Sequence, residues 1–130
     1  MVEYMRRVRI NSDKSHPNTA AVIAASKSPY IKVLALKAPG MGQTSRKIPN
    51  YKSDLDNKTC IKAGKNIKIP ALIVHGTADA DVEVEFGKEL AKSIKNSKLE
   101  LIDGADHRFT RREDFDKAIS VISEFLIKKK

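Results

Sequence analysis

The chain has 130 residues, of which 41% are hydrophobic, a length and composition typical of one domain with a packed core. Its single cysteine, Cys60, excludes an intrachain disulfide, and no apolar stretch is long enough to cross a bilayer or resembles a secretory signal. The net charge of +9 comes from lysines spread along the chain with acidic residues among them, which favours a solvated basic surface over a nucleic-acid site. We therefore expect a cytoplasmic protein that binds neither nucleic acid nor membranes.

The first part of the chain predicts one helix and one buried strand. Residues 19–26 are rich in alanine and follow Pro17, a residue suited to the start of a helix. Residues 31–38 form a short apolar run closed by a Pro-Gly pair, as in a strand inside a sheet. Residues 5–10 could form a frayed or edge strand, although three arginines argue against an interior position.

A long polar connection covers residues 40–69. Connections of this length in compact domains are usually functional lids or lack fixed structure, so we expect a lid-like segment. Its last part, residues 54–68, could form a short helix. Cys60 lies there without a base nearby in the sequence, and we interpret it as an inert or partly buried thiol.

The second part of the chain alternates strands with helices. Residues 71–75 and 98–102 are predicted strands, and each stops at or just before a glycine. Residues 84–95 and 111–127 have apolar side chains at helical spacing. Thr110 and the glutamate three residues later have the spacing of a capping box at the start of the last helix.

This order of elements predicts an α/β fold, in which a mostly parallel sheet of three to four strands is flanked by helices. We expect residues 1–130 to form a single, partial domain. A sheet this small leaves an edge without a neighbouring strand, and exposed edges tend to pair. We therefore expect a homo-oligomer or a partner chain at that edge.

Two strand ends carry the candidate chemistry. Asp79 and Asp81 follow the strand at 71–75, and His107 follows the strand at 98–102. Neighbouring parallel strands lie about 5 Å apart, so a carboxylate after one and an imidazole after the next can meet. A carboxylate that holds an imidazole is half of a nucleophile–base–acid arrangement. Taken alone, the aspartates could instead cap the following helix, and the histidine could be a surface residue in a turn.

The motifs in these two stretches resemble a known family. The segment IPALIVHGTADADV, followed by a helix and then LIDGADHRF, is similar to the last third of α/β hydrolases of the esterase, lipase and prolyl-oligopeptidase type. The resemblance covers most of residues 17–127 and implies the carboxyl-terminal half of that fold. It implies that Asp79 is the acid and His107 the histidine of a catalytic triad.

The nucleophile motif departs from the family pattern. Where the family has G-x-S-x-G, this chain reads Asp13-Lys14-Ser15-His16-Pro17, so that both glycines are replaced. The resemblance places Ser15 at the nucleophile position. A serine that caps the helix after it is an equally good interpretation.

Two hypotheses for the function follow. The first is a serine hydrolase that acts on a small-molecule ester or a peptide through Ser15, His107 and Asp79, without a metal or an organic cofactor. The second is a truncated, catalytically incompetent member of the family that acts as an interaction module or needs a partner chain. A basic protein that binds nucleic acid is a third, weaker interpretation.

Overall fold

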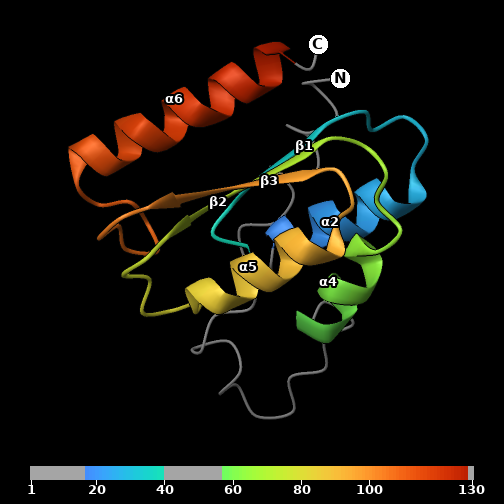
Figure 1. The fold of residues 1–130 in the computed structure, drawn as a ribbon, viewed down its shortest axis with the longest axis horizontal. Coiled ribbons are helices and arrows are strands. Elements are labelled where there is room, and N and C mark those ends of the chain that lie inside the picture. Colours follow the sequence, from blue (N-terminus) through green and yellow to red (C-terminus); the bar gives the residue numbers. More distant parts are fainter. Residues whose placement is uncertain (1–16, 40–56, 129–130) are drawn as a thin grey trace.

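The computed structural model of the protein describes residues 17–39 and 57–128 (Figure 1). The strand expected at residues 5–10, the candidate nucleophile Ser15 and residues 40–56 of the lid-like connection lie outside the described residues. The elements follow one another in the order α2 (Pro17–Lys27), β1 (Leu34–Lys37), α4 (Asn57–Gly64), β2 (Ala71–Gly76), α5 (Val84–Ser93), β3 (Ser97–Ile102) and α6 (Arg112–Lys128).

The three strands form one parallel sheet in the order β1-β2-β3, which confirms the predicted fold class. In the register of the sheet, Ile73 of β2 lies between Leu36 of β1 and Leu99 of β3. All six residues of β2 are buried, as expected of a central strand covered on both faces. Because the three strands are parallel, their carboxyl ends meet at one edge of the sheet.

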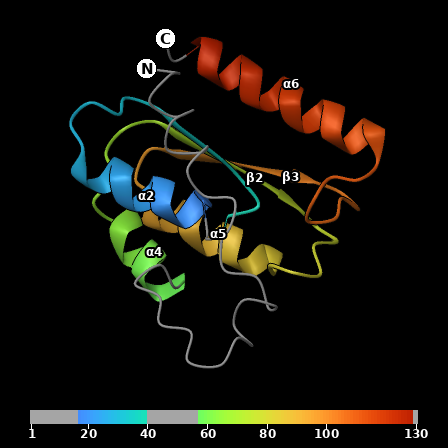
Figure 2. The ribbon, with the colours of Figure 1, turned by 180° about the vertical axis from the view of Figure 1, so that it is seen from behind.

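Helices cover the two faces of the sheet unequally: α2, α4 and α5 pack on one face and α6 on the other (Figures 1 and 2). Alternate residues of β2 serve the two faces, since successive side chains of a strand point in opposite directions. Ala71 and Ile73 join the core beneath α2, α4 and α5. Leu72 and Val74 join the core beneath α6, together with Phe109.

The short helix expected within residues 54–68 is present as α4. It packs between α2 and α5, and its Cys60 is fully buried in the same core as Val22 and Leu90. The thiol is thus more deeply buried than the sequence indicated. Residues 57–64 are part of the packed domain, and a role of residues 40–56 as a lid stays a prediction.

Helix α6 covers its face of the sheet incompletely. Ala118 is buried and Phe125 partly buried against the sheet, whereas Phe115 and Ile119 are 46% and 47% exposed. The apolar stripe predicted for this helix is therefore wider than the stripe that the sheet covers.

None of the described helices is both long and apolar enough to span a membrane.

The expected capping box at the start of α6 is not formed. The helix begins at Arg112, so Thr110 lies two residues before it. Both the backbone N–H and the hydroxyl of Thr110 donate to the Asp106 carboxylate instead, at 2.7 and 2.5 Å. Thr110 thus stabilises the turn before the helix.

The end of β2 and the turn after β3 approach each other closely at Gly76. A Cβ atom at this position would overlap the carbonyl oxygen of Ala105 and lie 2.7 Å from its carbonyl carbon. Those are backbone atoms, so they cannot turn aside as a side chain can. Only glycine allows the two chain segments to lie this close together.

We predict that Gly76→Ala destabilises the protein by about 2–3 kcal/mol, because the new methyl group forces two backbone segments apart. Gly104→Ala is the matched control. Gly104 has a φ of +74°, which costs an alanine about 1 kcal/mol, and the nearest atom to its new Cβ is the end of the Arg111 side chain, which can shift at a lower cost than backbone atoms. Urea denaturation of both variants measures the difference. An equal or smaller loss in Gly76→Ala would contradict the close approach.

Candidate active site

The two turns after β2 and β3 are joined by hydrogen bonds. The backbone N–H of Gly104 donates to the Thr77 hydroxyl at 2.7 Å, and that hydroxyl donates to the Asp103 carboxylate at 3.2 Å. The backbone N–H of Ala78 donates to the carbonyl of Ala105 at 3.0 Å. These bonds continue the pairing of the two strands into their turns, so the residues that follow have fixed relative positions.

Asp79 lies in the first of these turns, with its side chain fully buried. Its Oδ1 accepts hydrogen bonds from the backbone N–H groups of Asp81 and Val82, at 2.9 and 2.8 Å. The residue before α5 is Glu83, which makes no side-chain capping bond. Asp79 therefore orders its own turn, and the alternative interpretation of a helix cap is wrong.

His107 lies in the turn after β3 and contacts Asp79. Its Nδ1 is 2.8 Å from Oδ2 of Asp79, and its side chain is 35% exposed. Because a carboxylate at neutral pH only accepts hydrogen bonds, Nδ1 carries the hydrogen and Nε2 is left as a proton acceptor. The structure thus brings together the acid and the histidine that the two strand ends predicted.

Asp81 lies on the other side of the imidazole. One of its carboxylate oxygens is 3.7 Å from Nε2 of His107, and its side chain is 39% exposed. The ring is therefore placed between two carboxylates, one buried and one open to solvent. The sequence places Asp81 at the same strand end as Asp79, but a spacing of two residues does not show on which side of the imidazole its carboxylate lies.

The turn that carries His107 is stabilised by Asp106 and Phe109. The hydroxyl of Thr110, together with its backbone N–H, holds the pKa of the Asp106 carboxyl below its ordinary value. Phe109 has a positive φ of 52° and is almost completely buried beneath α6, which fixes this unusual backbone conformation. Lys37, at the end of β1, donates to the carbonyl of His107 at 3.4 Å and lies over the Phe109 ring.

Arg111 connects the same turn to α6. Its guanidinium donates to the mostly buried carboxylate of Asp114 at 2.7 Å and to the carbonyl of Asp103 at 3.3 Å. The hydrogen bond and the charge of Asp114 raise the pKa of Arg111 above its ordinary value. The start of α6 is thereby attached to the turn after β3.

No family model matches the sequence, and no curated protein sequence matches it. Solved structures do. The esterase domain of a Rhodothermus marinus protein superposes with a TM-score of 0.71 at 16% identity, covering 84% of this chain and 55% of that one. The Paleococcus ferrophilus monoacylglycerol lipase gives a TM-score of 0.69 at 16% identity, covering 87% and 65%. Est1E from Butyrivibrio proteoclasticus gives 0.67 at 20% identity, covering 86% and 57%.

The chain has part of an α/β-hydrolase fold. It spans between about half and two thirds of the length of these three structures, so it corresponds to a portion of their fold. The partial hydrolase fold contains the contact between Asp79 and His107. In residues 17–39 and 57–128, no group of three or more His, Cys, Asp or Glu side chains is arranged to hold a metal ion.

We predict that Thr110→Val destabilises the turn of His107 in a pH-dependent manner. The folded protein holds the pKa of Asp106 below its usual value of 3.8. The stabilisation that the ionised Asp106 gains from Thr110 is therefore present above pH 3.8 and is lost as the pH falls through the lower pKa of the folded protein. The unfolding midpoints of the wild type and Thr110→Val should therefore differ at pH 6 and converge at strongly acidic pH.

Thr110→Ser retains the hydroxyl and is the control for this comparison, so its midpoint should follow that of the wild type. A difference between the wild type and Thr110→Val that stays constant from neutral to acidic pH would show that the carboxylate of Asp106 is not the group stabilised.

Proposed function

We propose that the protein is a serine hydrolase that acts on carboxylic ester or peptide bonds, with His107 as general base and Asp79 as the acid that orients it. The observation that carries this proposal is the 2.8 Å contact between a buried carboxylate and Nδ1 of a partly exposed imidazole. The contact lies at the carboxyl end of a parallel sheet, where open α/β folds place their active sites. The likeness of the fold to that of esterases and lipases supports it.

The geometry of the pair suits proton transfer. With the hydrogen on Nδ1 directed at Asp79, the lone pair of Nε2 is free to accept the hydroxyl proton of a nucleophile as its oxygen attacks the substrate carbonyl. His107 then returns that proton to the leaving oxygen or nitrogen as the bond to the carbonyl carbon breaks. The buried negative charge of Asp79 stabilises the imidazolium formed between these steps.

Ser15 is the proposed nucleophile, because the resemblance to the family places it at the nucleophile position, just before the sequence of α2. The reaction proposed needs no metal and no organic cofactor, because the nucleophile, base and acid are all side chains. The substrate is a small ester or a peptide.

Asp81 modifies this arrangement. Its carboxylate lies 3.7 Å from Nε2, on the side from which a hydroxyl group has to reach the imidazole. A carboxylate there adds to the stabilisation of the imidazolium, since both ring N–H groups would then face a negative charge. Asp81 is partly exposed, so its side chain has room to turn away when a substrate arrives.

The second candidate function is that of an interaction module or of one half of a hydrolase completed by a partner chain. The observation that favours it is that the described residues place no further strand beside β1 or β3, the two edge strands of the sheet. The coverage of about half to two thirds of the matched structures agrees with this alternative.

We predict that Asp79→Asn lowers the rate of hydrolysis of an activated ester by about 10⁴-fold, because an amide in place of the carboxylate favours the wrong imidazole tautomer. His107→Gln should cause a loss of similar size, since it removes the base. Steady-state assays with a nitrophenyl ester measure both. Glu85→Gln, at an exposed carboxylate of α5, is the control and should keep the activity of the wild type.

A fluorophosphonate probe separates the two candidate functions. Labelling of the wild type that disappears in Ser15→Ala supports the hydrolase with this nucleophile, and labelling that persists assigns the nucleophile to another residue. If the folded wild type is neither labelled nor active, the hydrolase proposal is wrong for this chain and the interaction module is favoured.

We further propose that the open edge of the sheet pairs with a second copy or with a partner chain. Among the described residues no further strand lies beside β1 on its outer side, and a strand edge of this kind is a template for another strand. Sedimentation of the purified protein at concentrations of tens of micromolar should then give a mass above that of one chain. A strictly monomeric protein under these conditions would count against pairing between copies.

A further inference from the structure

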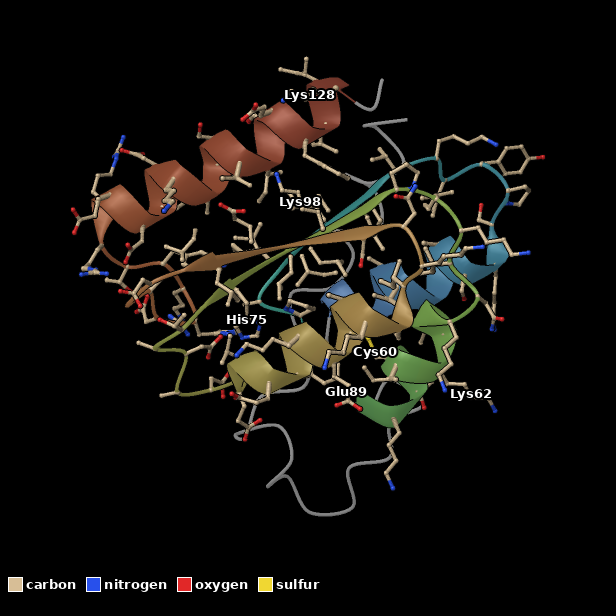
Figure 3. The ribbon with its side chains drawn as sticks, in the orientation of Figure 1. Cys60, Lys62, His75, Glu89, Lys98 and Lys128 are labelled. Carbon is tan, nitrogen blue, oxygen red and sulfur yellow. The ribbon has the colours of Figure 1, made fainter. Side chains whose placement is uncertain are left out.

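His75, the penultimate residue of β2, is a second buried histidine beside the candidate site. Its side chain is fully buried and lies between the sheet and α5 (Figure 3). Nε2 is 3.0 Å from the carbonyl oxygen of Val82 and 3.2 Å from Oδ2 of Asp79. Nδ1 has no hydrogen-bond partner among the described residues.

These contacts determine which ring nitrogen carries the hydrogen. A carbonyl oxygen only accepts hydrogen bonds, so Nε2 of His75 is the donor to Val82. The ring then directs its N–H toward the carbonyl of Val82, with the Asp79 carboxylate alongside. Nδ1 keeps a lone pair, and a second hydrogen there would be a buried donor without an acceptor.

The backbone of α5 holds the ring in this orientation. A Cβ atom at Gly87 would lie 2.6 Å from Nδ1 of His75 and 3.2 Å from Cγ. The absence of a side chain at Gly87 therefore makes the space that the imidazole occupies. Because the ring is packed against this glycine, its N–H group is directed toward the turn that contains Asp79.

We propose that His75 is a positioning residue that fixes the orientation of Asp79 and, through it, the tautomer of His107. This inference rests on the proposed function in one respect, namely that Asp79 orients the general base. Oδ1 of Asp79 is held by the backbone N–H groups of Asp81 and Val82. Oδ2 lies between the two imidazoles, 3.2 Å from His75 and 2.8 Å from His107.

Two effects of His75 act on the same carboxylate. Its hydrogen bond to the carbonyl of Val82 closes the turn whose backbone N–H groups hold Oδ1. Its partly positive N–H group lies next to Oδ2 and opposes rotation of the carboxylate away from His107. An apolar side chain of similar volume would fill the space but supply neither effect, and it would leave a buried carbonyl without a donor.

The test compares His75→Gln with His75→Leu in the full chain. The side-chain amide of glutamine places a nitrogen near the position of Nε2, so it retains a donor for Val82, whereas leucine has none. Nitrogen-15 and proton spectra of the imidazoles report the tautomer of His107 and the exchange of its Nδ1 hydrogen with water. A purely structural role for His75 would change the unfolding midpoint without changing those signals.

We expect the Nδ1 hydrogen of His107 to exchange about tenfold faster in His75→Leu and at nearly the wild-type rate in His75→Gln. If hydrolysis is measurable, kcat should fall by a similar factor in His75→Leu with little change in KM. Unchanged His107 signals in a folded His75→Leu would overturn the proposal.

A further variant keeps the proposal testable if His75→Leu does not fold. His75→Asn has an amide that is too short to reach the carbonyl of Val82, so it should resemble the expected His75→Leu result, and signals identical to those of His75→Gln would overturn the inference. The spectra do not depend on turnover. An inactive wild type would therefore contradict the proposed function while the role of His75 is still decided by the signals of His107.

Discussion

The arrangement of the candidate site depends on the hydrogen-bonded contact between the turns that follow β2 and β3. Thr77 and Ala78 bond to the turn that contains Gly104 and Ala105, and the missing side chain of Gly76 permits that approach. Asp79 comes one residue after Ala78 on one side, and His107 two residues after Ala105 on the other. The contact between Asp79 and His107 therefore follows from the way in which one backbone hydrogen bond and the Thr77 hydroxyl join the two turns.

Burial divides the roles within the pair. The carboxylate of Asp79 is removed from water, and the free-energy cost of that burial is offset by two backbone N–H donors and by His107. A carboxylate with its oxygens held in this way has little freedom to rotate. His107 keeps about a third of its side chain exposed, so its outer nitrogen remains within reach of other molecules. Asp79 is thus suited to orient the imidazole, and His107 is suited to exchange a proton with other molecules.

The turns that carry the pair are packed on both faces of the sheet, and Phe109 joins the turn of His107 to the core beneath α6. Under α2, α4 and α5 the sheet has a continuous core, and His75 and Gly87 join that core to the turn of Asp79. On the other face α6 leaves apolar side chains exposed, and among the described residues β1 has a free edge. The turns that hold the site are therefore well packed, while the exposed apolar side chains of α6 and the uncovered strand edge lie elsewhere, as expected for a portion of a larger hydrolase fold.

The sequence alone determined the alternation of strands and helices, the parallel sheet and the meeting of Asp79 with His107, because these follow from local periodicity and from the common edge of parallel strands. It did not reveal that His75 contacts Asp79 or that Asp81 faces the outer nitrogen of His107. Nor did it reveal that Thr110 donates hydrogen bonds to Asp106. Those contacts depend on how the turns fold back and on the space that Gly87 leaves for a ring. Such distances are set by the packing of segments far apart in the chain, and only the tertiary structure decided them.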